Sequence, residues 1–396
     1  MRVKCDELTV SRAALNNYGH LEPMIRELRD RRPLDLNAQA WRPANPTGTF
    51  AQWQTEARHC LLEGLHLDPG PLDLQPEILD RVPRDGFILE RMAFNTAPWS
   101  RVNGYFLLPT GVDYPVPGLV IFHAWGGPML FGKERIVDSG RDHPVLAAHR
   151  AEYYGGRYCA EEFARRGYAV IVIDAHHFGE RIPLGVAGVP DQIDPFTLGT
   201  EEFAQLNDRV AEQLYLGVRQ LNWAGTTWMG VNYWDDRRCV DYLASRPEVD
   251  AERLGCTGLS GGGWRTNILG ALDARIKAAV SGCWMTTGDY QQVYNADGAI
   301  GTFCLLPGVW DRLDVPDLTI MSAPCASMVV STMDDPLFPP EGQREAERQI
   351  RLGYEWAGCT QKFSHNAPNK PHCFDVDLQM DALSWFDHHL KVAARN

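Results

Sequence analysis

From about residue 86 to its end, the chain alternates short, uninterrupted apolar segments with segments of helical periodicity. The expected strands are 87–95, 102–109, 116–127, 169–181, 253–260, 277–284, 327–334 and 360–366. The expected helices between and after them are 153–168, 234–246, 263–276, 342–358 and 377–394. Apolar strands separated by helices predict an α/β fold, with a mostly parallel central sheet and helices on both faces. In such sheets, ligands bind at the carboxyl ends of the strands.

The rest of the chain lies before this pattern or interrupts it. Residues 1–85 are expected to form an N-terminal helical extension packed on the core, and residues 86–396 the main domain. Within the extension, apolar residues at helical spacing predict a helix over 47–67. Three insertions lack a strong strand pattern, and we expect them to be loops and short helices that roof the carboxyl edge of the sheet as a lid. These insertions are 128–152, 182–230 and 285–325.

Composition restricts the partners and the compartment. The 396 residues carry a net charge of −13 without a basic cluster, which disfavours nucleic acid and anionic membranes as partners. No apolar leader segment is evident at the amino terminus, so a cytoplasmic location is expected. Ten cysteines without a C-x-x-C pair indicate free thiols in a reducing compartment. We expect no metal, because Cys and His do not cluster at metal-ligand spacing.

One glycine-rich stretch joins an expected strand to an expected helix. It reads Gly258-Leu259-Ser260-Gly261-Gly262, which matches the G-x-S-x-G pattern of a nucleophile elbow. Such a turn exposes the hydroxyl of Ser260 at the top of the sheet. The alternative is a turn that binds phosphate at a helix N-terminus. That alternative calls for a lysine or a second fixed glycine pattern, and the stretch contains neither.

A serine nucleophile needs a base, and the base needs an acid that orients it. His372, in a loop before the last helix, is the expected base, with His365 as its rival. Asp335 and Asp334 both follow an apolar strand, and Asp335 is preferred because it precedes a proline at the start of the loop. The alternative is that both carboxylates only cap the helix that begins near residue 341. The chain order Ser, Asp, His is the order of this type of site.

Two backbone amides are expected to stabilise the developing oxyanion, those of Trp125 and Gly261. His123, two residues before Trp125, is expected to be a hydrogen-bonded core residue without a catalytic role. Trp264 and Trp284 follow strand ends, where they could line a substrate pocket or pack in the core.

Several linked motifs now occur in a recognisable order. They are "FHAWGG", "ARRGYAVIVIDAHHFGER", "DDRRCVDYLASRPEVDAERLGCTGLSGGG", "STMDDPLFPP" and "KPHCFD". From about residue 86 onward, the sequence resembles the α/β-hydrolase superfamily, in the bacterial branch of acetyl-xylan-esterase-like and dienelactone-hydrolase-like proteins. The resemblance implies a serine hydrolase that acts on esters, often acetyl esters of carbohydrates, without a cofactor. Ala124 stands where a glycine is usual in the oxyanion loop, and we expect Glu180 and Arg181 to pair with Asp235 or Asp236.

The sequence therefore predicts a serine carboxylic-ester hydrolase with the triad Ser260, His372 and Asp335. The expected substrate is a short-acyl ester of a carbohydrate or another small molecule. Hydrolysis of an amide, peptide or lactone on the same triad is the alternative within the enzymes, and a non-catalytic ligand-binding homologue is the alternative outside them. The sequence leaves open the acyl group, the alcohol and whether the chain forms a homo-oligomer.

Overall fold

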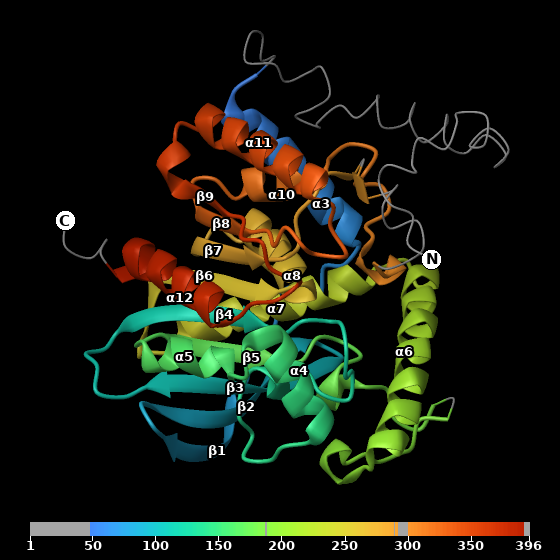
Figure 1. Ribbon diagram of the computed structural model, residues 1–396. Helices are drawn as coiled ribbons and strands as arrows, with labels where there is room; N and C mark the ends of the chain where they lie inside the picture. Colours follow the sequence, from blue (N-terminus) through green and yellow to red (C-terminus); the bar gives the residue numbers. More distant parts are fainter. Residues whose placement is uncertain (1–47, 187, 289, 292–299, 392–396) are drawn as a thin grey trace, which may run out of the picture.

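A single nine-stranded sheet forms the centre of the protein. The computed structural model describes residues 48–186, 188–288, 290–291 and 300–391. The strands lie in the order β1-β2-β3-β5-β4-β6-β7-β8-β9 (Figure 1). They are β1 (Glu77–Arg84), β2 (Phe87–Ala97), β3 (Ser100–Pro109), β4 (Val116–Phe122), β5 (Ala169–Ile173), β6 (Val249–Leu259), β7 (Ile276–Gly282), β8 (Ala326–Val330) and β9 (Phe363–Asn366). Pairing is antiparallel from β1 to β3 and between β3 and β5, and parallel from β5 to β9. The predicted α/β fold with a mostly parallel sheet is confirmed.

The two faces of the sheet are covered by different helices, because successive side chains of a strand point to opposite sides. In β4, Leu119 and Ile121 join one apolar core, and Val120 and Phe122 join the other. The first core is closed by α5 (Cys159–Arg165) and α12 (Val376–Phe386). The second is closed by α3 (Phe50–Leu65), α7 (Trp228–Ser245), α8 (Gly261–Leu272), α10 (Val315–Met321) and α11 (Pro340–Trp356). Figure 1 shows α5 and α12 on one side of the sheet and α3, α10 and α11 on the other.

The helix predicted over 47–67 is α3, and it is fastened to the second core. Thr49 caps it through a capping box: the amide of Gln52 donates to the Thr49 hydroxyl, and the amide of Thr49 donates to Gln52 Oε1. The Arg58 guanidinium donates to the carbonyl of Ala271 at the end of α8. Residues 1–47 of the predicted extension lie outside the described residues, whereas β1 within it pairs with β2 at the edge of the sheet. The boundary at residue 85 stays a prediction.

Two expectations about helices are wrong. The helix expected over 153–168 is two helices, α4 (Pro144–Tyr154) and α5, because Gly155 and Gly156 both adopt positive φ and end α4. The insertion 182–230 contains α6 (Thr200–Trp223), a helix of 24 residues rather than loops and short helices. Its buried residues follow helical spacing, namely Phe203, Leu206, Val210, Leu214 and Val218. α6 runs along one side of the molecule (Figure 1).

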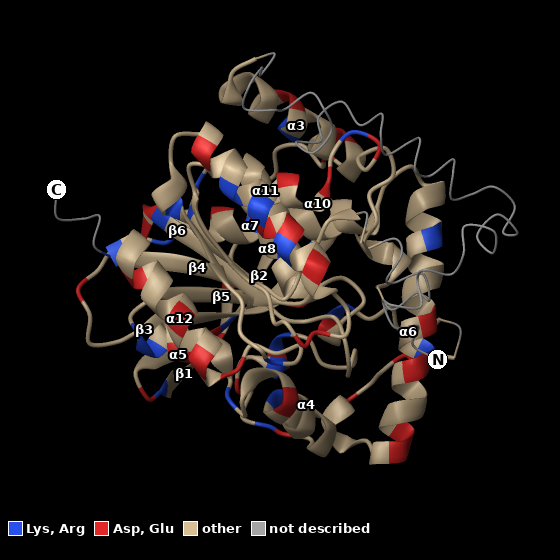
Figure 2. Ribbon diagram, turned by 45° about the horizontal axis from the view of Figure 1, so that its top comes forward, with Lys and Arg blue, Asp and Glu red and all other residues tan. Residues whose placement is uncertain are grey.

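Charged residues are spread over the helices that Figure 2 shows, with acidic and basic positions interspersed along α11. None of the described helices has the length and apolar character needed to cross a membrane. The nine cysteines of the described residues are buried and free. The cytoplasmic location stays a prediction.

The helices α7 and α8 share a buried ion pair. Arg265 Nε lies 3.0 Å from Asp236 Oδ2, and both side chains are almost completely buried. The guanidinium also lies 4.4 Å from the ring centroid of Phe122. The pair therefore connects both helices to the central strand β4.

Replacing Asp236 by alanine leaves the Arg265 charge buried without its partner. We expect Asp236→Ala to lower the free energy of unfolding by about 3–5 kcal/mol, measured by urea denaturation. Glu347→Ala is the control, because Glu347 pairs with an arginine on the surface of α11. This substitution should lower the free energy of unfolding by less than about 1 kcal/mol. Equal losses in the two variants would contradict this account.

Candidate active site

Ser260 occupies the turn between β6 and α8 in a backbone conformation that is unusual for a residue with a side chain. Its φ is 58° and its ψ is −119°. Its amide donates to the carbonyl of Gly282 at 2.7 Å, and its carbonyl accepts from the amide of Trp264 at 2.9 Å. Strained residues of this kind cluster at functional sites, where the surrounding structure holds them in place. The predicted strand–turn–helix context of Ser260 is therefore present.

The glycines around Ser260 allow backbone to touch backbone. A methyl group at Gly258 or Gly262 would lie 2.7 or 2.5 Å from the carbonyl oxygen of Phe122 in β4. A methyl group at Gly263 would lie 2.5 Å from the carbonyl oxygen of Gly282 in β7. The turn thus sits directly against both neighbouring strands, and no larger residue fits at these positions without displacing the backbone.

The structure brings His372 and Asp335 together. His372 Nδ1 lies 2.6 Å from Asp335 Oδ2, and Asp335 Oδ1 accepts from the amide of Leu337 at 2.8 Å. Asp335 is 4% exposed, whereas Asp334 is exposed and its amide donates to the carbonyl of Lys370. That backbone hydrogen bond ties the loop after β8 to the loop that carries His372. Of the two adjacent carboxylates, only Asp335 contacts the histidine.

The rival histidine has a different environment. His365 lies within β9, paired in register with Val329, and its Nε2 is buried without a hydrogen-bond partner among the described residues. Ser260, which is 8% exposed, forms no side-chain hydrogen bond with His372 in this structure. In structures without substrate such contacts are often long and shorten only when substrate binds.

A buried arginine, which the sequence analysis missed, holds the loop after β4. Arg135 Nη1 donates to the carbonyl oxygens of Ala124 and Gly126, at 2.6 and 2.7 Å. In a planar trans peptide, the carbonyl of Ala124 and the amide of Trp125 point in opposite directions. Arg135 therefore turns the Trp125 amide away from itself, and neither this amide nor that of Gly261 has a partner among the described residues. Burial lowers the pKa of Arg135 to about 10.

Further contacts support the same loop. The amide of Ala124 donates to the Tyr154 hydroxyl at 3.1 Å, and His149 Nε2 lies 3.3 Å from the carbonyl oxygen of Gly126. His123 Nδ1 lies 2.8 Å from the carbonyl oxygen of Ala124, and His123 Nε2 accepts from the amide of Ala175. His123 is thus a hydrogen-bonded core residue, as expected, and burial lowers its pKa well below the usual value.

Charged residues hold the loop after β5 against the loop after β4. Lys133 Nζ lies 2.8 Å from Asp174 Oδ2 and 3.3 Å from Glu180 Oε1. Burial opposes the charge of Lys133, yet its acidic neighbours raise its pKa well above the usual value. Arg181 Nη1 lies 2.5 Å from Asp235 Oδ2, and Asp235 is one of its two predicted partners. The expected pairing of Glu180 with an aspartate is wrong, because Glu180 forms its ion pair with Lys133. These contacts are structural supports of the loops around the site.

Aromatic side chains surround the turn. The Trp125 indole lies so close to Gly261 that a methyl group there would be 1.9 Å from Trp125 Cδ2. Ring centroids of Trp228, Trp284 and Phe303 lie 5.0, 5.7 and 5.4 Å from that of Trp125. Trp264 lies 5.4 Å from Trp284 in the same cluster. The indole N–H groups of Trp125, Trp228 and Trp264 are buried and have no acceptor among the described residues.

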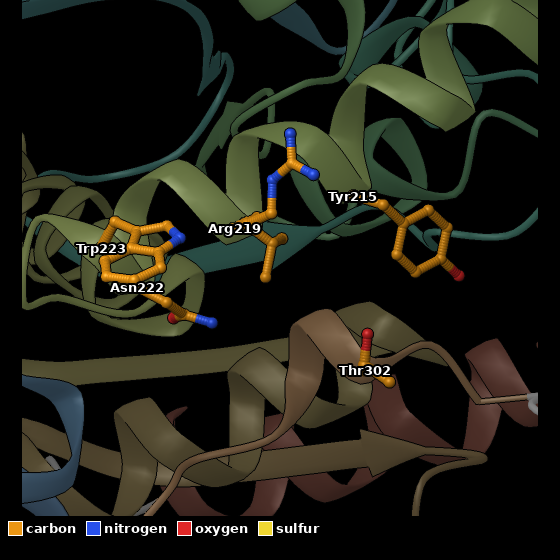
Figure 3. A pocket seen from close by; sticks show the side chains of 6 residues that line it. Tyr215, Arg219, Asn222, Trp223 and Thr302 are labelled. Carbon is orange, nitrogen blue, oxygen red and sulfur yellow. The ribbon is translucent and has the colours of Figure 1, made fainter.

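A groove of about 410 Å³ adjoins this cluster. It is lined by Tyr215, Val218, Arg219, Asn222 and Trp223 of α6 and by Thr302. Figure 3 shows the α6 side chains on one side and Thr302 across from them. Trp223 is 87% exposed, and the ring of Tyr215 lies 6.0 Å from Phe303, which in turn contacts Trp125. Two ring contacts thus connect the groove to the indole over Gly261.

A thiol also lies next to the histidine and the carboxylate. Cys283 follows β7, and its Sγ lies 3.4 Å from both Thr332 Oγ1 and the carbonyl oxygen of Cys373. Burial, and secondly the nearby Asp335 carboxylate, raise the pKa of the Cys283 thiol to about 12. The possible ligand atoms of Cys283, Asp335 and His372 lie within 4.8 Å of one another. They are the one such group of three or more among the residues searched, which are the described ones.

Comparison with known proteins identifies the family. The sequence profile of the Abhydrolase family matches residues 8–337. The chain belongs to this family. It is also 22% identical over 291 residues to YtaP of Bacillus subtilis (strain 168), a protein described as a hydrolase. The match covers 73% of this chain and 84% of that protein. The resemblance to α/β-hydrolases is thereby confirmed.

Solved structures of similar fold include esterases. A Bacteroides fragilis protein described as an acetyl xylan esterase matches with a TM-score of 0.65 and 18% identity, over 88% of this α/β-hydrolase and 82% of that chain. The glucuronoyl esterase of Solibacter usitatus matches with a TM-score of 0.61 and 16% identity, over 91% and 97%. At these identities the likeness establishes the α/β-hydrolase fold.

Arg135 is expected to act as a positioning residue. Replacing it with glutamine removes the charge that orients the Ala124 carbonyl, so we expect Arg135→Gln to lower kcat about tenfold or more, with a smaller change in KM. The measurement is steady-state hydrolysis of p-nitrophenyl acetate. Arg150→Gln is the control, because Arg150 is also buried but pairs with Asp142, away from the loop carbonyls. A fall in kcat of equal size in both variants would contradict the assignment.

Proposed function

We propose that this α/β-hydrolase is a serine hydrolase that cleaves carboxylic esters. The observation that carries the proposal is the hydrogen-bonded pair of His372 and Asp335 in a protein whose Ser260 is held on a strained turn. Ser260 is the nucleophile, His372 the general base, and Asp335 the acid that fixes the tautomer of the histidine. The family membership supports this assignment.

In the first half-reaction, the Ser260 oxygen attacks the ester carbonyl while its proton passes to His372 Nε2. Asp335 holds the proton on Nδ1, which leaves Nε2 free to act as the base, and it stabilises the imidazolium that forms. The tetrahedral intermediate collapses when His372 returns the proton to the leaving alcohol. In the second half-reaction, water loses a proton to His372 and attacks the acyl-enzyme. His372 then returns this proton to the Ser260 oxygen as the acid is released.

The amides of Trp125 and Gly261 are the proposed donors to the oxyanion. Neither amide has a partner among the described residues, and Gly261 is the first residue of α8, where the helix dipole favours negative charge. Arg135 orients the first amide through the carbonyl of the same peptide. Donors that are already oriented need no rearrangement as charge develops, which is the main source of their effect.

The aromatic cluster supports a short acyl group. Trp125, Trp264 and Trp284 are 6%, 2% and 8% exposed, so the space beside Gly261 is closely walled. Three buried indole N–H groups have no acceptor among the residues that the structure describes. They favour a substrate that brings oxygen atoms, because a buried donor left unpaired costs about 1–3 kcal/mol. Both features fit an acetyl-type ester of an oxygen-rich alcohol better than a long alkyl ester.

The groove along α6 is the proposed place for the alcohol part of the substrate. Exposed aromatic faces, such as those of Trp223 and Tyr215, suit stacking against a sugar ring. Arg219, Asn222 and Thr302 supply hydrogen-bonding groups at its walls. A carbohydrate ester is therefore the substrate class that we propose.

The triad assignment is tested by Ser260→Ala. We expect the variant to lose at least about 10³-fold in kcat on p-nitrophenyl acetate, because the nucleophile is absent, while the fold remains intact by circular dichroism. In the native protein we expect activity to fall from acetate to butyrate to octanoate. Full activity of Ser260→Ala would exclude the proposed mechanism, and activity rising with chain length would exclude the short-acyl substrate.

The groove assignment is tested by Trp223→Ala. We expect this variant to raise KM for acetylated xylo-oligosaccharides about tenfold, because stacking of a ring on an aromatic face is lost. Its kcat/KM for p-nitrophenyl acetate should stay within about twofold, since the small ester does not reach the groove. Trp99→Ala is the matched control, because Trp99 is also an exposed tryptophan and lies outside the groove. Equal changes in KM from Trp99→Ala and Trp223→Ala would count against the groove as a sugar site.

A further inference from the structure

Cys283 has no part in the proposed hydrolysis, yet it lies near His372, the proposed base, and Asp335, the carboxylate that orients this base. Its thiol is buried at the end of β7, where Cys283 adopts a φ of 51° and its amide donates to the carbonyl of Val330. The thiol, the Asp335 carboxylate and a nitrogen of His372 all lie within 4.8 Å of one another. These are three different ligand types on three separate loops.

We propose that Cys283, Asp335 and His372 form a binding site for a thiophilic divalent cation such as Zn²⁺, and that its occupation switches hydrolysis off. Thiolate, imidazole and carboxylate are the ligands that Zn²⁺ takes in proteins, and three protein ligands with one open position is a common arrangement. The inhibition rests on the proposed function, but the binding does not.

The geometry needs only a small adjustment. Zn²⁺ bonds of about 2.0–2.3 Å in a tetrahedron place ligand atoms roughly 3.3–3.6 Å apart. The longer distances between ligand atoms of the cluster, which reach at most 4.8 Å, would therefore shorten by up to about 1 Å. The distance of 2.6 Å between His372 Nδ1 and Asp335 Oδ2 would lengthen by a similar amount. All three residues lie in the loops that directly follow β7, β8 and β9, outside the strands themselves.

Charge and proton balance also favour the site. Binding converts the Cys283 thiol to a thiolate and releases one proton to solvent. The proton on His372 Nδ1 moves to Nε2, so that Nδ1 can bind the metal. One thiolate, one carboxylate and one divalent cation sum to zero charge, which avoids leaving an unpaired charge in a buried place. With Nε2 protonated and Asp335 bound to the metal, His372 no longer accepts the proton of Ser260.

The first experiment measures binding without any reference to activity. Cd²⁺ is titrated into the full-length protein, and the thiolate-to-cadmium charge-transfer absorption is followed in the ultraviolet. We expect an absorption equivalent to one cadmium–thiolate bond in the native protein, in Cys373→Ser and in Cys5→Ser. We expect this absorption to be lost in Cys283→Ser and Cys283→Ala. Cys373 is the matched control because it is a buried thiol next to His372, outside the cluster. A signal that survives in both Cys283 variants would overturn the site.

The second experiment measures inhibition of p-nitrophenyl acetate hydrolysis by Zn²⁺, with each variant compared with its own rate in a chelator. We expect the half-inhibitory Zn²⁺ concentration to rise at least about tenfold in Cys283→Ser, but not in Cys373→Ser. Cadmium binding at Cys283 together with undiminished hydrolysis would overturn the inhibitory role. A protein without ester activity would refute the proposed function and leave the cadmium titration as an independent test of the site.

Discussion

The close approach of backbone to backbone around Ser260 is the constraint on which the rest of the site depends. Gly258 and Gly262 lie against the carbonyl of Phe122, and Gly263 lies against that of Gly282. Because no side chain intervenes, the turn is anchored to β4 and β7 at once, and the strained conformation of Ser260 follows from the positions of its neighbours. The same strands then deliver the other parts: the loop after β4 carries Trp125, and the residue after β7 is Cys283. These glycines therefore fix how closely the Ser260 turn approaches the ends of β4 and β7.

Much of this arrangement could be predicted from the sequence, because the relevant signals are local. Apolar strands between helices predicted the sheet, and the glycine pattern placed Ser260 on a turn between strand and helix. The placement of Asp335 next to His372 agrees with the order of the motifs, but the choice between Asp334 and Asp335 needed the loop geometry, in which only one side chain points inward. The catalytic roles of these residues remain predictions.

Other features could not be predicted because they depend on contacts between distant segments. Arg135 has no motif of its own. Its position next to the loop after β4 becomes evident only when the short helical turn at 133–135 folds against residues 124–126. The length of α6 was missed for a different reason. Its apolar residues do follow helical spacing, but the many aromatic residues and prolines of the insertion, together with the lack of a strand pattern, suggested loops and short helices. The pairing of Lys133 with Glu180 joins two loops that are separated in the sequence by α4, α5 and β5.

Both the backbone amide and the indole of Trp125 belong to the proposed site, and this limits which substitutions can alter substrate specificity. Its amide is the proposed oxyanion donor, while its indole covers Gly261 and would form one wall of the proposed acyl space. A substitution that shortens this side chain would enlarge the pocket and, at the same time, release the loop whose geometry serves the transition state. Substrate range and turnover are therefore coupled at position 125. Replacing Trp284 by a smaller residue would enlarge the proposed acyl space without affecting a proposed oxyanion donor. Natural or engineered variants that accept larger acyl groups should therefore change Trp284 before Trp125.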